Sequence, residues 1–190
     1  MRLSVGALGV LGVVLALTAC GPSDAGSGSG APPAGAGAGR ADACLVGTWN
    51  VDVADVAQQA AALMRTGPGR GTAEGTITVI VGDTLTIRYA NTLIIVSDTA
   101  GRTVGVRDSY QGDAVSTDYT AKDGKILGTL PASSVTKTTA VIVGTQTQPA
   151  TSSQIPGALD LAQGQTTYTC SGSRATIGTG TTITWKLTKA

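Results

Sequence analysis

Leu45-Val46-Gly47-Thr48-Trp49-Asn50-Val51-Asp52-Val53 is the stretch that decides the predicted fold of this chain. Apolar residues alternate here with polar or small ones, which is the period of a half-buried β-strand. We therefore expect a first strand in this stretch, with Trp49, Val51 and Val53 on one face.

A helix is predicted directly after this strand, over about residues 54–65. Apolar residues recur there at the i, i+3, i+4 and i+7 spacing of one helical face. Asp52 or Asp55 can cap the start of the helix, and Thr66-Gly67-Pro68-Gly69 is a stop signal.

After the helix the period of the pattern changes to two, in about ten short segments separated by turn signals such as Gly82-Asp83 and Asp123-Gly124. Leu93-Ile94-Ile95-Val96 is apolar on both faces, which favours a central strand. The pattern predicts a mainly β fold, an antiparallel barrel or alternatively a β-sandwich, with one helix after the first strand. Residues 145–165 interrupt it, and we expect either a binding loop or a passive surface insertion there.

The N-terminal residues carry a targeting pattern. Met1-Arg2 is followed by an apolar run that ends at Leu17-Thr18-Ala19-Cys20, and the run is shorter than the roughly 20 residues of a membrane-spanning helix. The tetrapeptide resembles the lipobox of bacterial lipoproteins. This resemblance implies that residues 1–19 are a cleaved signal peptide and that a lipid on Cys20 anchors the protein to the cell membrane, on its extracytoplasmic face. A transmembrane anchor and an ordinary secretory signal are the alternatives.

Residues 20–43 are dominated by Gly, Ala, Ser and Pro. Such a segment has little apolar surface to bury, so we expect a disordered linker. The predicted organisation is therefore a signal peptide over 1–19, a lipidated linker over 20–43 and one β-barrel domain over 44–190.

Charge and composition exclude several functions. The chain has 13 Lys and Arg against 12 Asp and Glu, so nothing indicates a nucleic-acid partner. It has no His, which excludes a Ser-His-Asp nucleophile and imidazole metal sites. A carboxylate pair for hydrolysis could still form in space, for instance from Asp98, Asp108 and Glu74. We expect no catalytic residues, no cofactor and no metal.

Cys44 and Cys170 remain once Cys20 is assigned to lipid. Outside the cytoplasm such a pair is most simply a disulfide. Two free thiols or two metal ligands are the alternatives, although two thiolates without His make a poor zinc site.

Three short motifs carry a family resemblance. Gly47-Thr48-Trp49 resembles the opening motif of lipocalin-like barrels, and Thr117-Asp118-Tyr119 resembles their second motif. The lipobox, the linker and Tyr168-Thr169-Cys170 are also shared with actinobacterial lipoproteins that carry a lipocalin-like domain. The resemblance to this group covers residues 42–190. The resemblance implies a barrel whose floor is closed by Trp49 beneath a cavity. The helix departs from the family pattern because it follows the first strand.

The candidates for lining such a cavity are inward-facing aromatic and apolar residues: Trp49, Val51, Tyr89, Tyr119 and Trp185. The chain has no Phe, so a barrel lined mainly by smaller side chains could be underfilled. Core packing is the plain alternative for both Trp residues. Two functions follow: a barrel that binds a small apolar or amphipathic molecule, or a non-enzymatic module that contacts envelope proteins or glycans.

Overall fold

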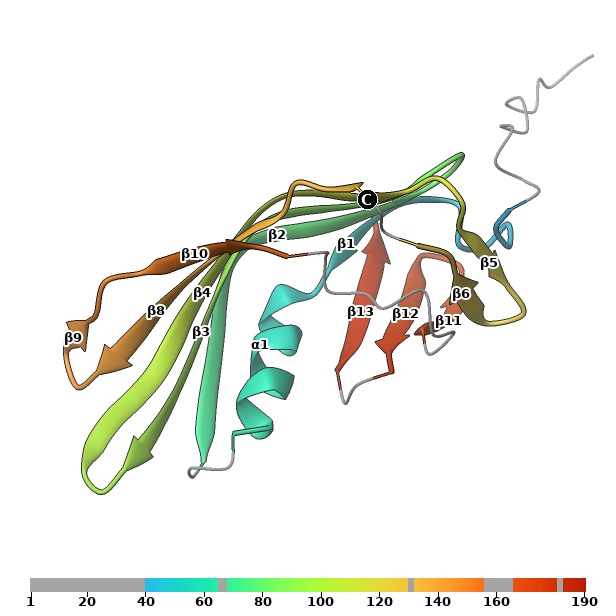
Figure 1. The fold of residues 1–190 in the computed structure, drawn as a ribbon. Coiled ribbons are helices and arrows are strands. Elements are labelled where there is room, and N and C mark those ends of the chain that lie inside the picture. The colour runs from blue at the N-terminus through green and yellow to red at the C-terminus, as the bar shows by residue number, and fades with distance from the viewer. Residues whose placement is uncertain (1–39, 65–67, 130–131, 156–165, 181–182) are drawn as a thin grey trace, which may run out of the picture. The chain divides into compact units, whose positions relative to one another are not determined.

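The computed structural model describes residues 40–64, 68–129, 132–155, 166–180 and 183–190. The predicted signal peptide, Cys20 and nearly all of the predicted linker lie outside these residues. The described part is mainly β, with a single antiparallel sheet and the helix α1 (Val53–Ala62) (Figure 1).

Three of the strands are much longer than the rest and form the middle of the sheet: β2 (Gly69–Val81), β3 (Leu85–Thr99) and β4 (Arg102–Ser116). The other strands are β1 (Gly47–Val51), β5 (Thr120–Lys122), β6 (Lys125–Leu127), β7 (Ala132–Ser133), β8 (Thr136–Val143), β9 (Gln146–Thr147), β10 (Thr151–Gln154), β11 (Thr166–Ser171), β12 (Arg174–Thr179) and β13 (Thr184–Lys189).

The hydrogen-bonded order is β10-β8-β4-β3-β2-β1-β13-β12-β11-β6-β5, with β7 on β4 and β9 on β8. The first and last strands, β1 and β13, are antiparallel neighbours, as a closed barrel would require. The order nevertheless ends at β10 on one side and β5 on the other, so the sheet described is not closed into a barrel. The coarse prediction of a mainly β antiparallel fold is confirmed, and the closed lipocalin-like barrel is not.

Helix α1 begins close to where the sequence predicts. Asp52 is its N-cap and accepts a hydrogen bond from the backbone N–H of Asp55 at 3.0 Å. The strand predicted over Leu45–Val53 is too long at its end, because Val53 is already helical. The helix ends at Ala62, a few residues before the predicted end.

Helix α1 packs against β2 at two glycines, Gly69 and Gly71, which have no side chains. A Cβ atom built on Gly71 would lie 1.9 Å from the carbonyl oxygen of Ala57, and one built on Gly69 would lie 2.3 Å from that of Ala61. Two glycines therefore let the backbones of helix and strand approach closely.

Strands β3 and β4 replace several of the short segments predicted after the helix. They pair in one uninterrupted register from Leu85↔Ser116 to Thr99↔Arg102. The predicted interruption at 145–165 also differs, because residues 146–147 and 151–154 pair with β8 as β9 and β10. Residues 156–165 lie outside the described part.

The two faces of the sheet differ in burial along β1, the end of β2 and the first part of β3. Odd-numbered residues of β1, β2 and β3 point to the face that carries α1 and the core, which we call the inner face. Its buried side chains form one cluster that includes Trp49, Val51, Ile77, Val79, Leu85, Ile87, Tyr89, Tyr119, Ile126, Ile177, Trp185 and Leu187.

Candidate functional site

Trp49 is packed into the core. Its side chain is 0 % exposed, and its indole N–H donates to the carbonyl oxygen of Leu45 at 2.7 Å. The ammonium of Lys189 lies 5.6 Å from the centroid of the ring. These contacts satisfy the indole within the protein.

The other four predicted cavity residues belong to the same buried core cluster as Trp49. Tyr89 and Trp185 are in edge contact, with ring centroids 6.4 Å apart. Val51 lines an open pocket of about 560 Å³ beside β12 and β13. Tyr119 is fully buried and donates its hydroxyl to the carbonyl oxygen of Gly82.

A polar cluster lies on the inner face next to Tyr89, and we define it as Asn91, Asp108, Tyr110, Lys137 and Thr139. The sheet register brings its members together, because Asn91 pairs with Tyr110, Tyr110 with Lys137 and Asp108 with Thr139. The rings of Tyr110 and Tyr89 are 6.3 Å apart, so an aromatic path links Trp185 to the cluster.

The charged members of the polar cluster neutralise each other. The ammonium of Lys137 lies 2.9 Å from one oxygen of Asp108, whose other oxygen accepts a hydrogen bond from Thr139 at 2.6 Å. Burial lowers the pKa of Lys137, but its bonds to Asp108 and its contact with Tyr110 outweigh burial, so the net direction is upward. Burial, reinforced by the charge of Asp108, raises the pKa of Tyr110. Lys137 and Tyr110 therefore both keep their protons at neutral pH.

Two buried polar side chains on the inner face of β3 have no hydrogen-bond partner among the described residues. They are the amide of Asn91, both of whose polar atoms are unpaired, and the hydroxyl of Ser97. Asn91 is 2 % exposed and Ser97 is 1 % exposed. Such groups are rare in folded proteins because leaving them unpaired costs stability, and they call for an explanation.

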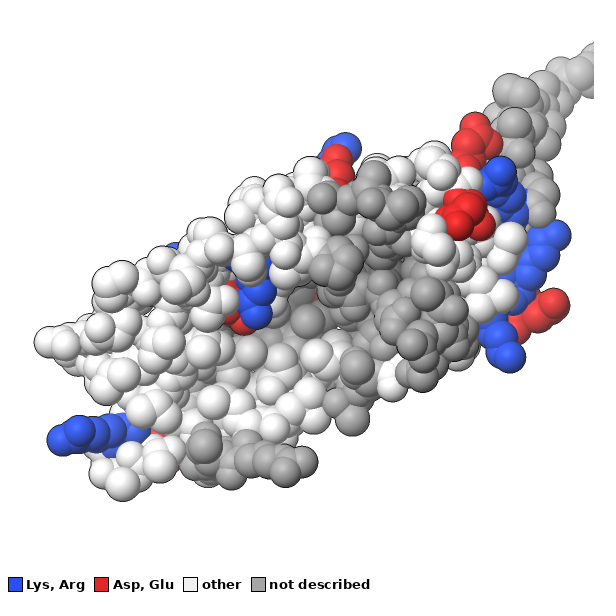
Figure 2. All heavy atoms as spheres, viewed as in Figure 1, with Lys and Arg blue, Asp and Glu red and all other residues white. Residues whose placement is uncertain are grey.

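An apolar surface extends the inner face beyond the polar cluster, toward the far end of β8. We call it the inner shelf and define it as Leu93, Ile95, Val104, Val106, Val141 and Val143. Cross-strand pairing aligns Ile95 with Val106 and Val106 with Val141. Val141 and Val143 are 46 % and 41 % exposed. In Figure 2 a group of charged atoms lies beside the hollow in the middle of the face seen there, and most other described atoms of that face are uncharged.

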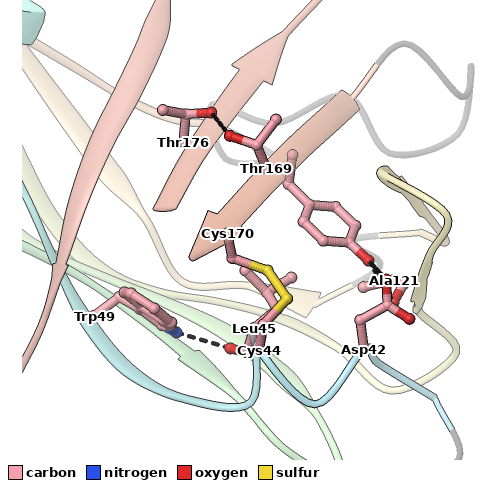
Figure 3. The surroundings of a disulfide bond; sticks show 9 residues. Asp42, Cys44, Leu45, Trp49, Ala121, Thr169, Cys170 and Thr176 are labelled. Carbon is pink, nitrogen blue, oxygen red and sulfur yellow. Dashed lines mark hydrogen bonds between the residues drawn. A yellow bond between two sulfur atoms is a disulfide. The ribbon is translucent and has the colours of Figure 1, made fainter. Parts of the chain in front are cut away.

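Residues 40–45 form a second structured region, which we call the N-terminal clamp. Cys44 is joined to Cys170 on β11, as the sequence predicts, across a separation of 126 residues (Figure 3). Ala41 makes a parallel bridge to Ala121, and the backbone N–H of Asp42 donates to the carbonyl oxygen of Ala121 at 2.8 Å. The clamp therefore attaches the start of the described chain to β5 and β11.

Tyr168 on β11 holds the N-terminal clamp through its hydroxyl. This hydroxyl donates to the carboxylate of Asp42 and lies 3.0 Å from the carbonyl oxygen of Ala121. Burial, followed by the hydrogen bond to Asp42 and its charge, raises the pKa of Tyr168 to about 12. The phenol therefore stays protonated in the folded protein well above its ordinary range.

The raised pKa of Tyr168 predicts a loss of stability at high pH. Because the pKa of Tyr168 is higher in the folded than in the unfolded chain, the protonated phenol stabilises the folded state. This stabilisation is complete below about pH 10 and is lost as the pH approaches about 12. We expect urea midpoints to fall across this window, and to fall less steeply in Tyr168→Phe. Equal slopes for the two proteins would contradict this assignment.

The sequence pattern did not indicate the polar cluster, because its members come from three strands whose register is non-local. One local signal was present. In the segment from Leu85 to Leu93 the odd-numbered residues are apolar or aromatic except Asn91, which continues the buried phase with a polar side chain. A polar residue at a buried position of the strand alternation needs a hydrogen-bond partner.

No protein-family model, curated protein or solved structure matches this chain. Among the described residues, no three or more Cys, Asp or Glu side chains are grouped so that they could hold a metal ion. Within the same residues, no helix has both the length and the apolar character needed to cross a membrane.

Proposed function

We propose that this protein is a lipid-anchored extracytoplasmic domain whose inner face binds a small apolar or amphipathic molecule. The observation that carries the proposal is the inner shelf. It is an apolar surface on the same face as the core, yet Val141 and Val143 on it remain 46 % and 41 % exposed. Exposed apolar surface beside a few convergent polar groups is typical of ligand sites.

The position of α1 supports this proposal. The helix lies over the inner face of β2 through Gly69 and Gly71, and the inner shelf continues from β3 across β4 to β8. An apolar ligand on the shelf would thus lie beside the helix, in a lipocalin-like use of the inner face of a sheet.

A charge placed on the inner shelf is expected to weaken binding. For Val141→Lys we expect the affinity for a pyrene-labelled alkane, followed by fluorescence, to fall about tenfold, because an apolar contact worth roughly 1–2 kcal/mol is lost. Leu127→Lys is the matched control, since Leu127 is similarly exposed at 44 % but lies on β6. Absence of saturable probe binding to the unaltered protein would refute the proposed function.

Anchoring rests on Cys20 and the lipobox-like tetrapeptide that it completes. We expect Cys20→Ser to move the protein from the membrane fraction to the soluble fraction, because the residue that would carry the lipid is gone. Ser23→Ala, three residues further on, should stay in the membrane fraction. A Cys20→Ser protein that still required detergent for extraction would contradict the lipoprotein assignment.

A module that contacts an envelope protein is the second candidate. Strand β10 ends the hydrogen-bonded order, and its four residues, Thr151–Gln154, are all exposed. An exposed sheet edge can accept a strand from a partner. Two results together would favour this function. The Val141→Lys variant would still bind the probe, and the protein would capture a partner that is no longer captured when β10 is disrupted.

A further inference from the structure

The amide of Asn91 marks the part of the described inner face where a hydrogen-bonding partner is missing. Asn91 lies on β3 between Gly75 on β2, which has no side chain, and Tyr110 on β4. Its oxygen and its nitrogen are both buried and have no partner among the described residues. A bound group that both donates and accepts a hydrogen bond would satisfy the two atoms together, as a hydroxyl or an amide does.

The charges near Asn91 offer nothing further to an ionised ligand. Lys137 is paired with Asp108, and the second oxygen of Asp108 is bonded to Thr139. By register, the next cation along the inner face of β4 is Arg102, six residues from Asp108 and therefore about 20 Å away. A carboxylate or phosphate at Asn91 would thus lose its water without gaining an available cation from the described part of β3, β4 or β8, which is costly.

The apolar side of the site begins at the next position of the same face. Leu93 follows Asn91 in the inner phase of β3, and Ile95 and Val106 continue the inner shelf toward Val141. The polar group and the apolar surface thus adjoin, in the order in which the two parts of an amphipathic molecule would meet them.

We infer that the ligand is an uncharged amphipathic lipid, whose hydroxyl or amide head bonds to the side chain of Asn91 while its hydrocarbon chain lies on the inner shelf. This inference rests on the proposed function and adds the class of ligand. It requires the head group to be neutral and able to donate a hydrogen bond.

The test is competition against the pyrene-labelled alkane by three lipids with the same oleoyl chain. Mono-oleoylglycerol is expected to displace the probe at a concentration at least about tenfold lower than oleate or oleoyl lysophosphatidylglycerol, as expected of a site built to hydrogen-bond its ligand. Anionic lipids that displace the probe equally well, or better, would overturn the inference. A probe that does not bind at all would refute the proposed function itself.

Asn91→Leu should abolish the preference for mono-oleoylglycerol. The same variant should melt at a higher temperature without ligand, because it removes a buried amide that has no partner. Asn50→Leu, at an exposed Asn on β1, is the control and should retain the preference. If Asn91→Leu does not fold, Asn91→Asp tests the same point. This variant loses the amide donor, so displacement of the probe by mono-oleoylglycerol should weaken about tenfold. An unchanged affinity for mono-oleoylglycerol would overturn the inference.

Discussion

Gly71→Val is expected to lower the free energy of unfolding by about 3 kcal/mol or more, a large effect for one substitution. The new Cβ would lie 1.9 Å from the carbonyl oxygen of Ala57 and 2.3 Å from its carbonyl carbon. Both atoms belong to the backbone of α1, so the clash can be relieved only by moving the helix. Urea unfolding followed by circular dichroism measures the loss.

The sign of this effect distinguishes helix packing from strand propensity. Valine is a better strand residue than glycine, so a position on β2 with free space above it would gain stability. Gly82→Ala is the control, because a Cβ there meets nothing within 4 Å, and its effect should stay within about 0.5 kcal/mol. A Gly71→Val protein as stable as this control would show that α1 does not pack on β2.

Removing the disulfide is expected to cost about 2–5 kcal/mol. Cys44 and Cys170 are separated by 126 residues, and a covalent loop of this length strongly restricts the unfolded chain. The double variant Cys44→Ala/Cys170→Ala should unfold at lower urea concentration. The unaltered protein in dithiothreitol should match it.

Dithiothreitol should not change the stability of the double variant further, because Cys20 is the one other cysteine in the chain. A reduced protein as stable as the oxidised one would contradict a structural role for the disulfide.

Local patterns predicted the elements whose cause is local. Asp52, one of the two predicted caps, is the N-cap of α1. The predicted turn at Asp123-Gly124 lies between β5 and β6, with both residues at positive φ. The alternating residues Ile77, Val79 and Val81 on β2 are all buried. The disulfide followed from counting cysteines.

Features that depend on long-range register were not predictable in the same way. Gly112 interrupts the local strand pattern, yet it lies inside β4 with φ +117°. The polar residues around Asn91 likewise hid the continuity of β3. Barrel closure depends on whether the two end strands meet, and no local pattern reports whether β10 reaches β5. The Lys137–Asp108 pair arises from the register of β4 and β8 alone.

The N-terminal clamp has a mechanical consequence. Tension applied between the two ends of this chain would pass from Cys44 to Cys170 through the sulfur bridge. The intervening residues, which include β1 to β10 and the whole inner shelf, form a loop that the disulfide closes, so such a pull cannot extend them. Stretching could extend only the parts of the chain outside this loop. A tethered protein would therefore keep the surface that we assign to its ligand under load, for as long as the cysteines stay oxidised.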